Sequence, residues 1–128
     1  MKLRFNPRRP SLIVIRVEIA GPLGAGFLRM ALDTGAVTTL IDPKPLQTLG
    51  YGPCDGMPRV RIVTAGDVRD AVQAKVQTVS ALGYEKHDFP ALISPLPKAS
   101  GVDGLLGLNY LRERKLTLDF LKGEIIIE

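Results

Sequence analysis

The sequence predicts a single all-β domain. The length of 128 residues fits one domain with a real core, and Val, Ile and Leu dominate its apolar residues. Turn residues recur at short intervals, since the chain contains 13 Gly and 10 Pro. The runs between these turns are apolar or alternating and have the lengths of strands. We count eight or nine strands and two short helices, without a separate second domain.

The charge and cysteine content of the chain indicate which binding partners and which cellular location to expect. The net charge of +4 is compatible with binding to nucleic acid, but the basic residues are dispersed among 13 acidic ones and aromatic residues make up only 5%. We therefore expect no nucleic-acid partner. Cys54 is the single cysteine, so no internal disulfide forms and we expect a cytoplasmic protein. The apolar run Leu12 to Ile15 is far too short to span a bilayer, so we expect no membrane partner.

The N-terminal part begins without a pattern and continues with two strands. Residues 1–10 carry two prolines and four basic side chains, and we expect them to form a basic arm that is extended or disordered. The domain is expected to cover residues 11–128. Residues 12–19 predict the first strand, and the glycine cluster at 21–26 predicts a hairpin connection to a second strand at 27–32. Because this cluster leads into a strand, it does not form a phosphate-binding loop at a helix.

The triplet Asp33-Thr34-Gly35 lies between the second strand and a third apolar stretch that ends at Ile41. A carboxylate at such a buried turn loses hydration, so its ionised form needs hydrogen bonds or a shared proton. A plain turn explains the triplet alone if Asp33 bonds its own backbone and Gly35 supplies a positive φ.

The next segment carries clear helix and loop patterns. Residues 42–50 predict a short helix, with Asp42 as N-cap, Pro43 at the first helical position and a glycine past the end. The breakers in 51–58 predict a loop, in which we interpret Cys54 as an inert thiol. Its alternative role as a nucleophile requires a base and a positioned donor that the sequence does not display.

An alternating segment follows, and it predicts a β-hairpin. Residues 59–63 and 68–72 alternate polar and apolar side chains around a turn at 64–67. Such a hairpin is either an ordinary part of a sheet or a mobile arm that closes over a cleft. Residues 74–79 predict a further strand.

The remaining residues predict a polar loop and the closing elements. We interpret 83–90 as a loop in which His87 is solvated, and 91–93 as a short strand. One His and one Cys cannot assemble a structural zinc site, so we expect no metal and no cofactor. Residues 101–111 predict a strand that ends in Gly107 and passes into a short helix ending near Arg114. The final elements are two strands, at 116–120 and 124–128, that form a hairpin.

The order of these elements resembles the retroviral-type, or retropepsin-like, aspartic proteases, and most closely their small bacterial single-domain members. The likeness rests on Asp33-Thr34-Gly35-Ala36 between apolar strands, on the hairpin, and on Leu105-Leu106-Gly107 opening a helix about seventy residues later. It covers residues 11–128. The resemblance implies a small closed β-barrel with a flap hairpin and one or two short helices.

The resemblance also implies how the site works. Two carboxylates share one proton in this family, and Asp33 would be the base in one subunit and the acid in the other. Asp103, in Val-Asp-Gly, does not reproduce the triplet, so the second carboxylate would come from a homodimer. The implied roles are support of the active site by Thr34, Gly35 and Ala36, flap and substrate binding by Val63, Thr64, Ala65, Gly66 and Asp67, and loop packing by Leu105, Leu106 and Gly107.

Three departures from the family pattern affect these expectations. Leu108 stands where retroviral members carry an Arg, so a buried Arg contact is either missing or moved to Arg112. The flap lacks the run of glycines found in retroviral enzymes. The terminal strands of retroviral dimers have no certain counterpart, although 124–128 could serve if it is an unpaired apolar edge strand.

The sequence thus predicts an aspartic endopeptidase that cleaves peptide or unfolded protein substrates as a homodimer. The alternative is a non-catalytic retropepsin-like module that dimerises and binds peptides without cutting them. A third hypothesis, an Asp-nucleophile phosphotransferase, requires a second Asp at the position of Gly35.

Overall fold

The computed structural model describes residues 1–52, 57–64 and 67–128. The predicted loop thiol, Cys54, lies outside these residues. The described residues form ten strands and three short helical segments, in the order β1 (Lys2–Arg4), β2 (Val14–Gly21), β3 (Gly24–Leu32), β4 (Leu40–Ile41), α1 (Pro43–Thr48), β5 (Arg59–Thr64), β6 (Asp67–Ala81), β7 (Tyr84–Ile93), the 3-10 turn η1 (Lys98–Ser100), β8 (Gly104–Leu106), α2 (Leu108–Leu111), β9 (Leu116–Asp119) and β10 (Glu124–Ile127).

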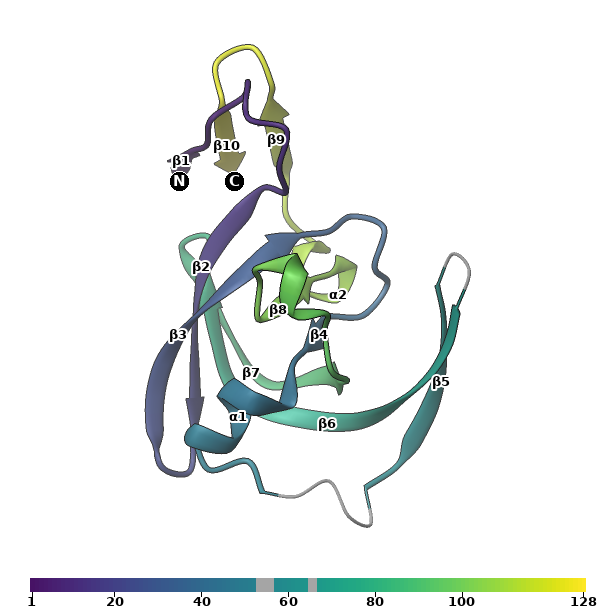
Figure 1. The fold of residues 1–128 in the computed structure, drawn as a ribbon. Helices are drawn as coiled ribbons and strands as arrows, with labels where there is room; N and C mark the ends of the chain where they lie inside the picture. Colours follow the sequence, from purple (N-terminus) through teal and green to yellow (C-terminus); the bar gives the residue numbers. More distant parts are fainter. Residues whose placement is uncertain (53–56, 65–66) are drawn as a thin grey trace.

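The strands form a closed barrel and a small terminal sheet (Figure 1). The larger sheet has the order β2-β3-β8-β4-β7-β6-β5, and an additional pairing of β2 with β6 closes six of its strands into a barrel. Strand β5 is not part of the closed barrel, and among the described strands it pairs with β6 alone. The prediction of an all-β closed barrel with short helices is confirmed.

Alternation along the strands builds the core. In β2, Val17 and Ile19 are fully buried, whereas Arg16 between β2's buried positions is exposed. Met30 in β3 and Ile41 in β4 face the same apolar cluster and are also fully buried. Each such side chain contributes about 1.5–3 kcal/mol relative to an exposed one, so the barrel interior stabilises the strands that carry the site.

Helix α1 begins where the sequence predicts it. The Asp42 carboxylate caps the helix by accepting a hydrogen bond from Lys44 N at 2.9 Å, and Pro43 occupies the first helical position. The other oxygen of Asp42 accepts from Leu96 N at 3.0 Å. The cap therefore also fixes the segment that follows β7.

Two predictions between residues 74 and 93 are wrong in detail. Residues 74–79 are not a separate strand, because they continue β6 over its 15 residues. Residues 83–90 are not a polar loop, because β7 begins at Tyr84 and pairs with β6 in an antiparallel register. Glu85, His87 and Asp88 in β7 are exposed, and His87 Nε2 lies 3.2 Å from the carboxylate of Glu85. An outward-facing polar strand has the composition of a loop.

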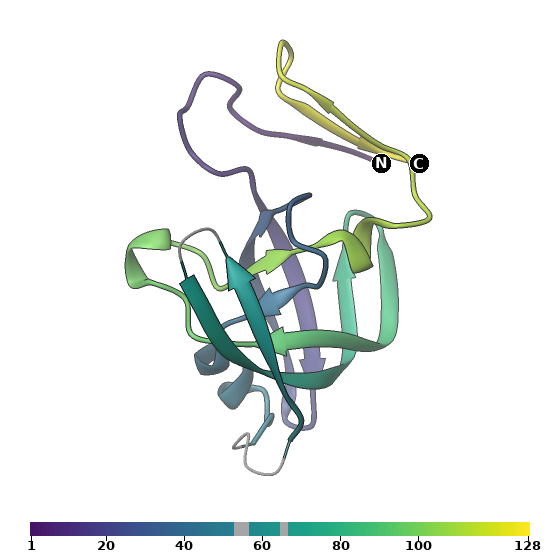
Figure 2. The same cartoon turned by 90° about the vertical axis from the view of Figure 1, so that its right-hand side faces the viewer.

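The terminal sheet corrects two further expectations. Residues 2–4 of the expected arm form β1, which pairs with β10, because a three-residue strand is too short to show a pattern and its partner lies at the other end of the chain. Strand β10 lies between β1 and β9, so residues 124–128 do not meet the condition of being an unpaired edge strand. In Figure 2 this sheet stands apart from the barrel and carries both chain ends. The boundary at residue 11 stays a prediction.

Tyr110 joins α2 to the β6–β7 connection. Its ring is fully buried and stacks on Tyr84 at 4.6 Å between centroids. Its hydroxyl accepts a hydrogen bond from Ala81 N at 2.8 Å and lies 2.9 Å from Ala81 O and 2.6 Å from Tyr84 O, to one of which it donates. This hydroxyl therefore satisfies backbone groups inside the protein.

We expect Tyr110→Phe to lower the free energy of unfolding by about 1–3 kcal/mol, because the buried Ala81 N–H loses the hydroxyl group to which it donates. Burial raises the pKa of Tyr110, so the neutral phenol is favoured in the folded state. That contribution is complete below the ordinary tyrosine pKa of about 10 and declines as the pH rises above it. Urea unfolding at neutral and alkaline pH measures both effects. An unchanged unfolding free energy in the variant would contradict the assigned role.

Among the described residues, no helix has the length and apolar character needed to cross a membrane.

Candidate active site

Asp33 is held at the end of β3 by backbone hydrogen bonds. Its N–H donates to Leu106 O at 3.0 Å, and its Oδ1 accepts from Gly35 N at 2.9 Å. The side-chain-to-backbone turn expected for Asp33 is thus present, but Gly35 does not have a positive φ. Asp33 is half-buried rather than buried, and its Oδ2 has no hydrogen-bond partner among the described residues. One carboxylate oxygen is fixed and the other is available.

The segment Leu105-Leu106-Gly107 packs directly behind the Asp33 loop. β8 pairs in parallel with β3, with Leu106 opposite Leu32. Gly107 lies against the loop backbone so closely that a Cβ at this position would be 2.7 Å from Ala36 O. Leu108 N then donates to Ala36 O at 2.8 Å. The segment therefore lies close to the Asp33 loop, and its role in supporting the active site stays a prediction.

Thr39 and Asn109 form a hydrogen-bond network that the sequence interpretation missed. Thr39 is fully buried, and both its N–H and its hydroxyl donate to Asn109 Oδ1, at 2.9 and 2.8 Å. The Thr39 hydroxyl also accepts from Gly107 N at 3.0 Å, and Asn109 Nδ2 donates to Pro90 O at 2.8 Å. The available signal was the pair Thr38-Thr39 between the apolar residues Val37 and Leu40, of which Thr39 is the buried one. This network joins the Asp33 loop to α2 and β7.

We expect Thr39→Val to lower the free energy of unfolding by about 1–3 kcal/mol, because an isosteric methyl leaves the buried Gly107 N–H without an acceptor. Chemical denaturation measures the loss. Thr117→Val in β9 is the matched control, since this exposed threonine has no hydrogen bond through its side chain in the described structure. Equal effects of the two substitutions would show that the network does not stabilise the loop.

Arg112 does not replace the family's buried Arg. Its side chain is exposed and has no polar partner among the described residues, while Leu108 is half-buried. We expected the buried Arg contact of the family to be either missing or moved to Arg112, and the structure does not show it at Arg112.

The expected flap is the hairpin of β5 and β6. The last paired residues are Thr64 and Asp67, and the tip residues Ala65 and Gly66 lie outside the described residues. Near the tip, the side chain of Val63 is 76% exposed. Val68, its partner on β6, is 58% exposed, so two apolar side chains lie exposed at this end of the hairpin.

Asp67 and Arg69 form an ion pair at the start of β6, the second strand of the expected flap. Asp67 accepts hydrogen bonds from Val68 N at 2.8 Å and from Arg69 Nε at 2.9 Å. The bond from Arg69 is the largest cause of the lowered pKa of Asp67, so the carboxylate stays charged to lower pH. Arg69 also donates to Pro95 O at 3.0 Å, which ties the strand to the segment after β7. The mobility of the flap stays a prediction.

A cavity of about 610 Å³ lies between the Asp33 loop and the flap, which share one side of the barrel (Figure 1). Of the predicted site residues, the cavity brings together Asp33, Gly35, Ala36, Val63 and Leu105. Thr34 is exposed outside its lining, Asp67 is exposed on the flap, and Leu106 and Gly107 are buried behind the loop. The other lining residues are mostly apolar, and they include Val37, Leu40, Ile62 and Leu92.

Asp33 is the only carboxylate among the described residues that line this cavity. Asp103, the other candidate acid, accepts a hydrogen bond from Arg29 N at 2.9 Å and does not line it. A single subunit therefore presents one acid group to the cleft. Among the described residues, no group of three or more His, Cys, Asp or Glu is placed to hold a metal ion.

Comparisons with known proteins agree with this arrangement. A family model described as aspartyl protease matches residues 15–110. Among solved structures, the chain is similar to a retropepsin-like aspartic protease from Rickettsia conorii, with a TM-score of 0.72 and 18% sequence identity. The match covers 99% of this chain and 90% of that one. No curated protein sequence is significantly similar to the chain. The structural likeness shows that the fold is retropepsin-like.

Proposed function

Because the chain belongs to the aspartyl protease family, we propose that it is an endopeptidase that hydrolyses peptide bonds as a homodimer. The observation that carries this proposal is the single half-buried Asp33 carboxylate, with a free Oδ2, in a cavity bounded by the flap. Peptide hydrolysis by this route requires two carboxylates that share one proton. A second copy of the chain, related by a two-fold axis, supplies the other Asp33.

In the proposed reaction, the ionised Asp33 takes a proton from a water molecule, and the protonated Asp33 of the second copy donates one to the carbonyl oxygen of the substrate. Water attack forms a tetrahedral intermediate. Proton transfer to the amide nitrogen then allows the C–N bond to break, which releases a carboxylic acid and an amine. The paired carboxyl groups titrate together with one pKa raised, so we expect activity at acidic pH.

The residues around Asp33 position this chemistry. Gly35 leaves space at the dyad, since a Cβ there would lie 3.2 Å from Asp33 Oδ1. The exposed Thr34 ties the two loops across the axis through its hydroxyl in this proposal. The flap residues 63–67 close over an extended substrate that pairs through its main chain, and the apolar lining favours apolar side chains next to the scissile bond.

Digestion of a peptide library at several pH values, followed by mass spectrometry, tests the proposal. We expect internal cleavage with apolar side chains beside the cut. Peptide binding without any cleavage at any pH would instead favour the alternative, a non-catalytic module that dimerises and holds peptides. We also propose a cytoplasmic location, supported by the single cysteine of the chain.

A further inference from the structure

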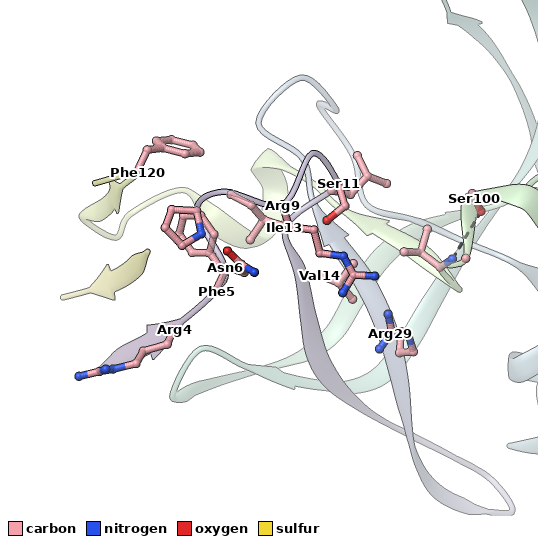
Figure 3. A pocket seen from close by; sticks show the side chains of 14 residues that line it. Arg4, Phe5, Asn6, Arg9, Ser11, Ile13, Val14, Arg29, Ser100 and Phe120 are labelled. Carbon is pink, nitrogen blue, oxygen red and sulfur yellow. Dashed lines mark hydrogen bonds between the residues drawn. The ribbon is translucent and has the colours of Figure 1, made fainter. Parts of the chain in front are cut away.

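A second cavity, of about 450 Å³, lies between the N-terminal segment and the barrel (Figure 3). Its walls come from Arg4 of β1, from most of the segment that joins β1 to β2, from Val14 of β2 and Arg29 of β3, from the end of η1 and the two residues after it, and from Phe120. It shares no lining residue with the active-site cavity. Its volume falls in the range of ligand sites in proteins.

The cavity is lined by three arginines and by no acidic residue. They are Arg4 on β1, Arg9 in the arm and Arg29 on β3. In the part of the chain that the structure describes, none of these guanidinium groups takes part in a hydrogen bond or an ion pair. Figure 3 shows the guanidinium groups of Arg9 and Arg29 on the same side of the cavity, beside Val14, and Arg4 at the opposite end. Like charges gathered in one cavity repel each other, and a bound anion relieves that repulsion.

The backbone on both sides of the cavity is fixed. Arg29 exchanges hydrogen bonds with Asp103, from Arg29 N to Asp103 Oδ2 at 2.9 Å and from Asp103 N to Arg29 O at 2.7 Å. Asp103, the acidic neighbour of the site, is thus held at the Arg29 backbone. On the other side, Ser11 N donates to Arg9 O at 2.8 Å. Both arginines therefore project from backbone that takes part in hydrogen bonds.

The cavity wall between the arginines has both apolar and polar side chains. Phe5, Ile13 and Val14 are half-buried apolar residues, and Ser11 and Ser100 add hydroxyl groups. A nucleic acid would need a long basic groove with aromatic residues for stacking, and a free inorganic anion would make no use of the apolar wall. A polypeptide segment that carries both acidic and apolar side chains matches both kinds of wall.

We propose that this cavity binds an acidic segment of a polypeptide, with its carboxylates at Arg9 and Arg29 and its apolar side chains against Phe5 and Val14. Guanidinium groups bind carboxylates through charge-assisted, often bidentate hydrogen bonds. The binding site shares no lining residue with the active-site cavity, so binding there does not require hydrolysis.

Fluorescence anisotropy with full-length Asp33→Asn protein tests this proposal without cleavage. The probe is a labelled peptide of alternating Glu and Leu, and the comparison peptide has Gln in place of each Glu. We expect Arg9→Gln and Arg29→Gln each to weaken binding of the Glu peptide about tenfold. Arg112→Gln is the matched control, because Arg112 is exposed, lacks a partner in the described structure and lies outside the cavity. We expect no change in that variant.

Several outcomes would overturn the proposal. The first is that Arg112→Gln weakens binding of the Glu peptide as much as Arg9→Gln does, and the second is that the Gln peptide binds as tightly as the Glu peptide. The third is that inorganic phosphate binds more tightly than the Glu peptide. The fourth is that a single-stranded oligonucleotide binds more tightly than the Glu peptide and that this binding depends on Arg9. Arg9 and Arg29 are exposed, and thermal unfolding curves check that their variants stay folded. Since the assay uses inactive protein and a site that shares no lining residue with the active-site cavity, a negative result refutes this site alone. Digestion of the peptide library by the wild type tests the proposed function separately.

Discussion

Asp33→Asn removes peptide hydrolysis and leaves the fold intact. An amide at this position cannot take a proton from water, so we expect the rate to fall on the order of 10³-fold or more. The substitution keeps the side-chain oxygen that accepts from Gly35 N, and the residue is only half-buried. Its effect on the unfolding free energy should therefore stay within about 1 kcal/mol.

Hydrolysis of an unfolded protein at acidic pH, followed on a gel, measures this loss, and a thermal unfolding curve confirms the fold. Asp103→Asn is the matched control, because Asp103 does not line the cleft and the amide oxygen can still accept from Arg29 N. We expect the control to remain active. A cleaving Asp33→Asn protein, or an Asp103→Asn protein that is equally inactive, would contradict the assignment.

Dilution of the protein causes a steep loss of specific activity. Each described subunit presents one carboxylate to its cleft, so a dissociated subunit lacks the second acid. Below the dissociation constant of the dimer, the fraction of paired subunits falls in proportion to concentration, and the activity per subunit falls with it. Activity assays across a dilution series, together with sedimentation at the same concentrations, measure both quantities. Constant specific activity in samples that sediment as monomers would contradict a shared site.

Local chemistry explains what the sequence predicts well. Asp42 and Pro43 mark the start of α1 because capping depends on neighbouring residues alone. The alternation in 59–63 and 68–72 predicts the β5–β6 hairpin for the same reason, since its two strands are joined by a short turn. The position of Asp33 between two apolar stretches likewise predicts a loop that joins two strands.

Long-range contacts explain what the sequence does not predict. Thr39 bonds to Asn109 across 70 positions of the chain, and its place next to apolar residues shows that it needs a partner without showing which residue supplies it. Strand β1 pairs with β10 at the other end of the chain, and residues 84–90 belong to a strand because β6 supplies their hydrogen-bond partners. The cavity of Arg9 and Arg29 is assembled in the same way, from segments far apart in sequence.

Mixing the wild type with Asp33→Asn protein tests the shared active site most directly. The wild-type concentration is held constant, the variant is added in increasing amounts, and time is allowed for subunits to exchange. If two Asp33 carboxylates form one site, wild-type subunits are drawn into inactive mixed dimers, and an equimolar mixture keeps about half of the original activity. Asp103→Asn protein, added in the same way, should not inhibit. Wild-type activity that stays constant at every proportion of Asp33→Asn would show that one subunit suffices, and would contradict the account.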